Sequence, residues 1–158
     1  MPNIENPEWE AELPGLRGVR VGAAAGAEKL GATLYEVDPG GRVSPLHIHH
    51  GNEELLFVIA GRPTLRTPDA ERKLEPGEVV AFLSGRRGAH QILNRSDASA
   101  RVLIVSTKIY PEVVEHPDSN KVVAITGAPD ETAALFLAFR RDDAVPVTEG
   151  EEGRTSAG

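Results

Sequence analysis

The sequence contains no cysteine among its 158 residues. Disulfide bonds, zinc ribbons, thiol nucleophiles and cysteine-ligated iron–sulfur clusters are therefore excluded. An excess of positive charge is also missing, because 24 acidic residues outnumber 17 basic ones and leave a net charge of −7. An acidic chain is a poor match for a nucleic-acid backbone or an anionic membrane surface. We therefore expect neither as a partner.

Long hydrophobic runs are missing as well. The longest, Ala133 to Phe139, has seven residues, whereas a membrane-spanning helix needs roughly 18. The first residues, Met1 to Glu8, are acidic and lack the apolar stretch of a secretory signal. The absence of cysteine also fits a reducing compartment. These features predict a cytoplasmic protein without a membrane partner.

Aromatic residues are scarce, at 4% of the chain, so a core must be built mainly from valine, leucine, isoleucine and alanine. Glycine and proline are frequent, with 16 and 12 copies dispersed along the chain. Dispersed turn residues suit many short strands, and they predict an antiparallel sandwich or barrel. The expected strands are residues 30–37, 53–59, 63–67, 72–75, 79–83, 89–94, 101–107, 121–126 and 135–140. A helix is the alternative for residues 130–140, because alanine and leucine favour it and Asp130 would cap it.

Two of these segments, residues 53–60 and 102–105, are almost continuously apolar. Such runs indicate strands that are buried on both faces. In a small barrel one face fills the interior, so something else must cover the outer face. The candidates are a second sheet, the N-terminal arm or another subunit, and the pattern predicts a homodimer.

Histidine is concentrated in one short segment, where His47, His49 and His50 follow Pro45. Residues two apart on a strand point to the same face, whereas on a helix they diverge. His47 and His49 therefore converge on one ion only if the backbone is extended, which Pro45 favours for its preceding residue. Imidazole suits zinc, copper, iron and nickel, and a neighbouring carboxylate adds manganese. His50 is expected at the surface.

Two adjacent carboxylates, Glu53 and Glu54, follow the histidines. Adjacent strand residues point in opposite directions, so only one of them can share a face with the histidine pair. A hairpin through residues 50–52 would bring Glu54 back across from His49, with Glu53 left in solvent. His90 is a third candidate imidazole, which only tertiary structure could deliver to the same place.

These residues resemble the first sequence motif of the cupin superfamily, in full. The matching positions are Gly41, His47, His49, Glu54 and Gly61. The second motif resembles the segment that contains Gly77, Gly85, His90 and Asn94 in the family's order. This chain departs from the family in two ways, because Leu83 replaces a proline and the loop before His90 is longer.

The resemblance spans roughly residues 30–107 and implies an all-β, double-stranded β-helix (jelly-roll) barrel, which we expect over residues 30–140. An N-terminal arm with a first strand would occupy residues 1–29, and a partly disordered tail residues 141–158. It further implies one divalent ion per chain, Zn, Mn, Fe or Ni, held inside the barrel. The implied ligands are His47, His49, Glu54 and His90.

Other polar residues are candidates for the surroundings of this site. Tyr35 lies on an early strand, and Asn94 would orient a turn or an outer ligand contact. Arg86 and Arg87 lie on the lengthened loop, where they would guard the barrel mouth or simply be solvated. His116 lies in a loop without a partner at ligand spacing.

Two functions remain open from the sequence. The first is a metal-dependent enzyme, isomerase-like or dioxygenase-like, that acts on a small polar molecule. The second is a binding or sensing protein that takes a small ligand and uses the metal structurally. An enzyme needs an open coordination position and a pocket with a further polar group, whereas a binding protein needs only the pocket.

Overall fold

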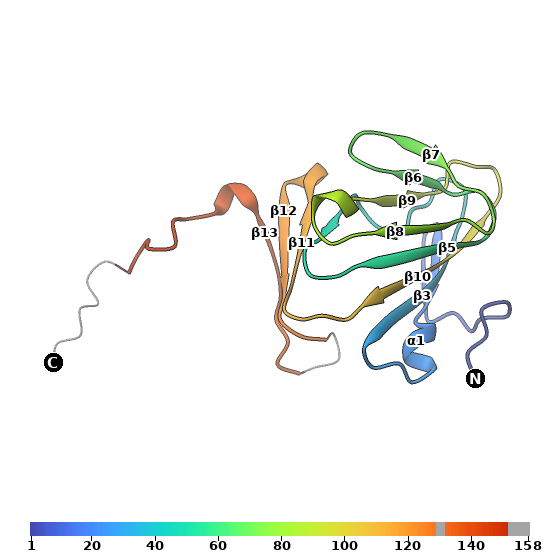
Figure 1. The fold of residues 1–158 in the computed structure, drawn as a ribbon, viewed down its shortest axis with the longest axis horizontal. Helices are drawn as coiled ribbons and strands as arrows, with labels where there is room; N and C mark the ends of the chain where they lie inside the picture. Colours follow the sequence, from blue (N-terminus) through green and yellow to red (C-terminus); the bar gives the residue numbers. More distant parts are fainter. Residues whose placement is uncertain (129–131, 152–158) are drawn as a thin grey trace.

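The computed structural model describes residues 1–128 and 132–151, and these residues form two facing layers of antiparallel strands (Figure 1). The first layer is a six-stranded sheet in the order β1-β2-β3-β10-β5-β8. Its strands are β1 (Ala11–Leu13), β2 (Leu16–Val19), β3 (Leu30–Val37), β10 (Ala100–Thr107), β5 (Glu54–Ala60) and β8 (Val79–Phe82). The central strand β10 pairs with β3 along its whole length, from Ala100 opposite Val37 to Thr107 opposite Leu30.

The second layer is made of two smaller sheets that one extended segment joins. The three-stranded sheet has the order β7-β6-β9, and the four-stranded sheet has the order β13-β12-β11-β4. Their strands are β7 (Glu71–Lys73), β6 (Thr64–Arg66), β9 (Gln91–Leu93), β13 (Phe136–Arg140), β12 (Lys121–Ile125), β11 (Glu112–His116) and β4 (Ile48–His49). Bridges from Arg42 to Leu93 and from His47 to His90 link the two sheets. The layer is therefore continuous across the residues that carry the histidines.

Helical structure is short within the described ranges. The one α-helix there, α1 (Val21–Ala24), follows β2. Three short 3-10 turns occur at Arg86–Gly88, Pro117–Ser119 and Arg141–Asp143. Residues 136–140 form a strand, so the helix considered for that region is wrong there; residues 129–131 lie outside the described part. The jelly-roll prediction is confirmed.

The barrel core lies between the two layers. Leu56 and Val58 of β5, Val102 of β10 and Ile92 of β9 are buried together. Their partners are Leu65, Leu74 and Phe82. The alternation along β5 and β10 places these side chains inside and their neighbours outside.

A second cluster lies on the outer face of the six-stranded sheet. Val19, Val21 and Leu34 are buried there, with Trp9 and Leu103 packed against them. The N-terminal segment therefore covers part of the outer face of this sheet. It is one of the three coverings considered from the sequence, beside a second sheet and another subunit. Arg17 and Arg101 both bond to Glu36 and lie against the Trp9 ring, which fastens the segment in place.

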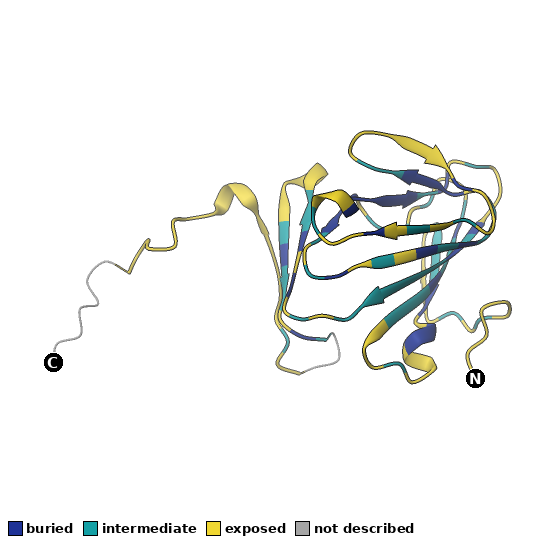
Figure 2. Cartoon of the chain, viewed as in Figure 1, coloured by how far each residue is buried: buried dark blue, intermediate teal, exposed yellow. Residues whose placement is uncertain are grey.

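The described residues leave part of that outer face exposed, at Leu55 on β5 and Val79 on β8. In the other layer, every residue of β13 is exposed (Figure 2). Residues 141–151, which follow β13, extend away from the barrel (Figure 1). The predicted homodimer stays a prediction, as do the boundaries at residues 29/30 and 140/141.

Candidate metal centre

Three imidazoles converge on a single carboxylate oxygen inside the barrel. Oε2 of Glu54 lies 3.2 Å from Nε2 of His90, 3.6 Å from Nε2 of His49 and 3.9 Å from Nε2 of His47. Ligand atoms of His47, His49 and Glu54 all lie within 4.8 Å of one another. His90 is 2% exposed and His47 is 9% exposed. Four groups that lie up to 43 positions apart in the sequence therefore share one small volume.

Backbone pairing explains how the chain brings these groups together. His47 and His90 form an antiparallel bridge, with both N–H···O distances at 3.1 Å. His49 lies on β4 two residues later, on the same face as His47. Glu54 is the first residue of β5 and points into the barrel like Leu56. Phe82 stacks on the His90 ring, with centroids 3.6 Å apart, and fixes its plane.

The hydrogen bonds of two histidines determine which ring nitrogen carries the proton. Nδ1 of His90 lies 2.8 Å from the carbonyl oxygen of Gly88. Nδ1 of His47 lies 3.0 Å from the carbonyl oxygen of Pro45. A carbonyl only accepts hydrogen bonds, so Nδ1 is the donor in both neutral rings. Their Nε2 atoms are therefore left with lone pairs that face Glu54.

This arrangement fits a divalent cation. Oε2 of Glu54 is buried and makes no hydrogen bond to any part of the chain that the structure describes. In the neutral tautomers, Nε2 lone pairs and a carboxylate face one another, which is repulsive unless a positive charge lies among them. Imidazole and carboxylate together are the donor set of zinc, manganese, iron and nickel sites. The residues present therefore suit such an ion.

The surroundings shift the acidity of two of these groups. Burial, together with the neighbouring His90 and His49, lowers the pKa of His47 to about 4. Burial alone would raise the pKa of Glu54, but the neighbouring His90, His49 and His47 lower it overall. Near neutral pH the site thus holds an ionised Glu54 and a neutral His47 that can act as a ligand.

The metal-free protein is expected to lose stability as the pH falls from 6.5 toward 4, in part through His47. The unfolded chain binds a proton on His47 below its ordinary pKa of 6.5, whereas the folded chain binds it only near 4. In that window the unfolded state holds more protons, so acid favours unfolding by up to about 1.4 kcal/mol per pH unit from this residue. Urea unfolding at pH 7, 6 and 5 with a chelator present measures the slope. Equal slopes for the wild type and His47→Gln would contradict this account.

Two cavities adjoin the histidine cluster. The inner one, about 210 Å³, is lined by the four candidate ligands and by the hydroxyl side chains of Thr33, Tyr35, Ser44 and Ser106. The outer one, about 290 Å³, includes His49 and Glu54 in its wall and has Arg20 and Lys108 among its other lining residues. A larger cavity of about 480 Å³ lies under the N-terminal segment, lined by Trp9 and Val19, and includes none of these histidines. A further cavity of about 220 Å³ is lined by Glu54 but by none of the candidate histidine ligands. The two cavities beside the histidines are therefore the relevant ones.

The remaining predicted residues lie in different places. Tyr35 faces the inner cavity, and burial raises the pKa of its hydroxyl. Asn94 is buried away from both cavities, where its amide donates to the carbonyl oxygens of Val37 and Ala98 and holds a turn. Arg86 and Arg87 are exposed on their 3-10 turn and line neither cavity.

Of the two histidines expected to lie apart, His50 is exposed and pairs with Glu115 at 2.8 Å. The ring of His116 lies 6.2 Å from that of His47, centroid to centroid, and faces a separate cavity of about 150 Å³.

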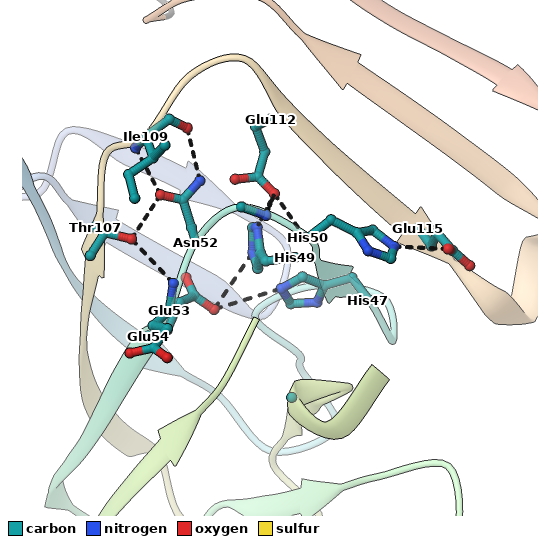
Figure 3. Close-up of polar contacts among 12 residues, drawn as sticks. His47, His49, His50, Asn52, Glu53, Glu54, Thr107, Ile109, Glu112 and Glu115 are labelled. Carbon is teal, nitrogen blue, oxygen red and sulfur yellow. Dashed lines mark hydrogen bonds and ion pairs between the residues drawn. The ribbon is translucent and has the colours of Figure 1, made fainter. Parts of the chain in front are cut away.

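One buried carboxylate was missed by the sequence reasoning. Glu112 on β11 is 3% exposed, and its Oε1 lies 3.6 Å from Nδ1 of His49 (Figure 3). Its Oε1 also accepts hydrogen bonds from the backbone N–H groups of His50 and Gly51. Its strand reads EVVEH, without apolar alternation, so no local pattern singles out Glu112 or connects it to His49.

The fold and the site together define a jelly-roll barrel with a histidine–glutamate cluster in its interior. A family model described as a cupin domain matches residues 33–106, which contain all four candidate ligands. This match assigns the part of the chain that carries the site to the cupin superfamily. No helix among the described residues has the length and hydropathy that crossing a membrane requires.

Individual relatives agree with this assignment. A germin-like protein of Arabidopsis thaliana is 28% identical over 110 residues, which cover 66% of this chain and 47% of the relative. The chain thus spans about half the length of that relative. Among solved structures, a sugar phosphate isomerase of the cupin superfamily from Silicibacter pomeroyi superposes with a TM-score of 0.76 at 24% identity, covering 94% of this chain and 98% of the other. A protein from Acidithiobacillus ferrooxidans, with the same suggested activity, gives a TM-score of 0.78 at 23% identity and covers 91% and 92%.

Proposed function

We propose that this chain is a metal-dependent enzyme that acts on a small, polar, sugar-like molecule. One divalent ion, Zn, Mn, Fe or Ni, would be held by His47, His49, Glu54 and His90. The observation that carries the proposal is the convergence of three Nε2 atoms on Oε2 of Glu54 beside a cavity of about 290 Å³.

The bound ion would act as a Lewis acid toward adjacent oxygens of a carbonyl and a hydroxyl group. The chain itself supplies polar groups around that position. Thr33, Ser44 and Ser106 present hydroxyls to the inner cavity, suited to a substrate rich in hydroxyl groups. Tyr35 presents a phenol whose raised pKa keeps it protonated at neutral pH, so that it donates a hydrogen bond.

The outer cavity favours a substrate with an anionic end. Arg20 and Lys108 line it together with His49 and Glu54, so a molecule lying on the ion would direct its other end toward these two cations. Guanidinium and ammonium groups are the usual partners of phosphate and carboxylate. This agrees with the sugar phosphate isomerase from Silicibacter pomeroyi, the activity of which suggests the class of compound to assay first.

The test is elemental analysis followed by isomerisation assays. Protein purified without chelator is expected to carry about one divalent ion per chain and to interconvert an aldose phosphate and a ketose phosphate only when loaded. Tyr35→Phe is expected to lower kcat more than it raises KM, because it removes one hydroxyl and leaves the ligands in place. Protein that is metal-free as isolated and cannot be loaded would end the proposal. Ligand binding without turnover of any sugar phosphate would instead support the binding function.

A further inference from the structure

We propose that Glu112 is a positioning residue that holds His49 in the tautomer and orientation needed to bind the metal. The proposal rests on the proposed function, because it takes His49 as a metal ligand. Glu112 lies on β11, outside the region that matches the cupin domain. It would make the four-stranded sheet part of the metal site.

The imidazole of His49 lies between two carboxylates. Its Nε2 faces Oε2 of Glu54 at 3.6 Å, and its Nδ1 faces Oε1 of Glu112 at 3.6 Å. Figure 3 shows the ring between the two acids. Because Nε2 must be deprotonated to bind a cation, the proton has to reside on Nδ1. The facing carboxylate is a suitable acceptor for it.

His49 differs in this respect from the other two histidines. Nδ1 of His47 and of His90 each lie within hydrogen-bond distance of a backbone carbonyl oxygen. Nδ1 of His49 is buried and makes no hydrogen bond within residues 1–128 and 132–151. Oε2 of Glu112 is also buried and makes no hydrogen bond within these ranges. The distance of 3.6 Å is just beyond a hydrogen bond, so a small rotation of the ring closes it. With Nε2 bound to a cation, the ring proton of His49 would be on Nδ1, which faces Glu112.

The position of Glu112 is fixed from two directions. The N–H groups of His50 and Gly51 donate to its Oε1 at 3.1 and 3.2 Å, which ties the carboxylate to the loop after β4. Asn52 then bonds to Thr107 and to the backbone of Ile109, which ties the same loop to the connection between β10 and β11 (Figure 3). The carboxylate is therefore held beside His49 rather than free to turn away.

The negative charge of Glu112 also balances the ion. Glu54 contributes one negative charge to a divalent cation, and Glu112 would contribute a second across the His49 ring. A carboxylate bonded to the far nitrogen of a ligating histidine strengthens that ligand, and loss of such a partner typically costs 10- to 100-fold in metal affinity. Glutamine keeps the shape and both backbone hydrogen bonds but removes the charge.

The experiment compares zinc affinity of the full-length wild type, Glu112→Gln and Glu115→Gln by competition with a chelator. Glu115 is a matched control, since it lies on the same strand and pairs with His50, which is not a candidate ligand. We expect a loss of about 10- to 100-fold for Glu112→Gln and none for Glu115→Gln. If Glu112→Gln does not fold, Glu112→Asp withdraws the carboxylate by one methylene and is expected to show the same loss.

Long-range ¹H–¹⁵N spectra of the histidine rings provide a readout that a purely structural role would not change. In the wild type, with and without zinc, His49 is expected to carry its proton on Nδ1. Glu112→Met, which removes the acceptor oxygen that faces Nδ1, should shift the metal-free ring toward the other tautomer. Equal zinc affinities together with unchanged His49 tautomers would overturn the role of Glu112 and leave the proposed function intact. A wild type that binds no zinc would overturn both.

Discussion

Glu54→Gln is expected to remove most of the metal-binding capacity of the protein. Oε2 of Glu54 is the atom on which all three candidate imidazoles converge, and this carboxylate is the anionic member of the proposed ligand set. Glutamine is isosteric and fills the same space beside Leu56, so packing is preserved while the charge is lost. We expect zinc affinity to fall by more than the ~10- to 100-fold that changes outside the ligand set typically cost. Turnover of any substrate that needs the ion should fall with it.

Glu53→Gln is the natural control for this change. Glu53 is the preceding residue and is exposed. Its described hydrogen bonds are made by its backbone, since its N–H donates to the Thr107 hydroxyl and its carbonyl accepts from the Thr107 N–H. The two variants therefore remove the same charge one residue apart, on opposite sides of the strand. Zinc titration of both variants, with circular dichroism to confirm folding, separates the metal site from general electrostatics. Equal affinities for Glu54→Gln and the wild type would show that the ion, if bound, is held elsewhere.

The parts of the fold that follow from local patterns could be predicted from the sequence. The strand predicted for residues 30–37 has the same bounds as β3, because alternation and the flanking turn residues determine it locally. The opening hairpin was missed, although Pro14 and Gly15 form the turn between β1 and β2. The four prolines and glycines of the first residues suggested an extended arm instead. Strands of three and four residues are too short for a periodic pattern to distinguish them from an extended arm.

The candidate site, too, could be predicted from the sequence only where local patterns determine it. The two-residue spacing of His47 and His49 predicts a shared face, and the return of the chain through residues 50–52 predicts the approach of Glu54. His90 could be assigned only from the family resemblance, because its bridge to His47 spans 43 residues of chain. Glu112 was out of reach, since its contact with His49 depends on the pairing of β11 with β4. Long-range strand pairing leaves little trace in a single sequence.

A second large effect is expected from Gly88→Ala, this time on stability. Gly88 is buried at the end of the 3-10 turn before His90. A methyl group at this position would overlap the carbonyl oxygen of Leu83 and lie 2.8 Å from its carbonyl carbon. Both atoms belong to the backbone, so no side chain can move aside and the turn itself must shift. We expect a loss of about 3 kcal/mol or more in the free energy of unfolding, the upper part of the range for overpacked sites.

This substitution also connects the turn to the metal site, because the carbonyl oxygen of Gly88 is the acceptor for Nδ1 of His90. A displaced carbonyl would release the His90 ring, so zinc affinity should fall along with stability. Arg87→Ala is the matched control, since Arg87 precedes Gly88 in the same turn and its side chain is exposed. That change is expected to alter stability by no more than about 0.5 kcal/mol. Urea unfolding and zinc titration of both variants measure the two effects, and a Gly88→Ala protein as stable as the wild type would show that the turn can adopt another path without disturbing the barrel.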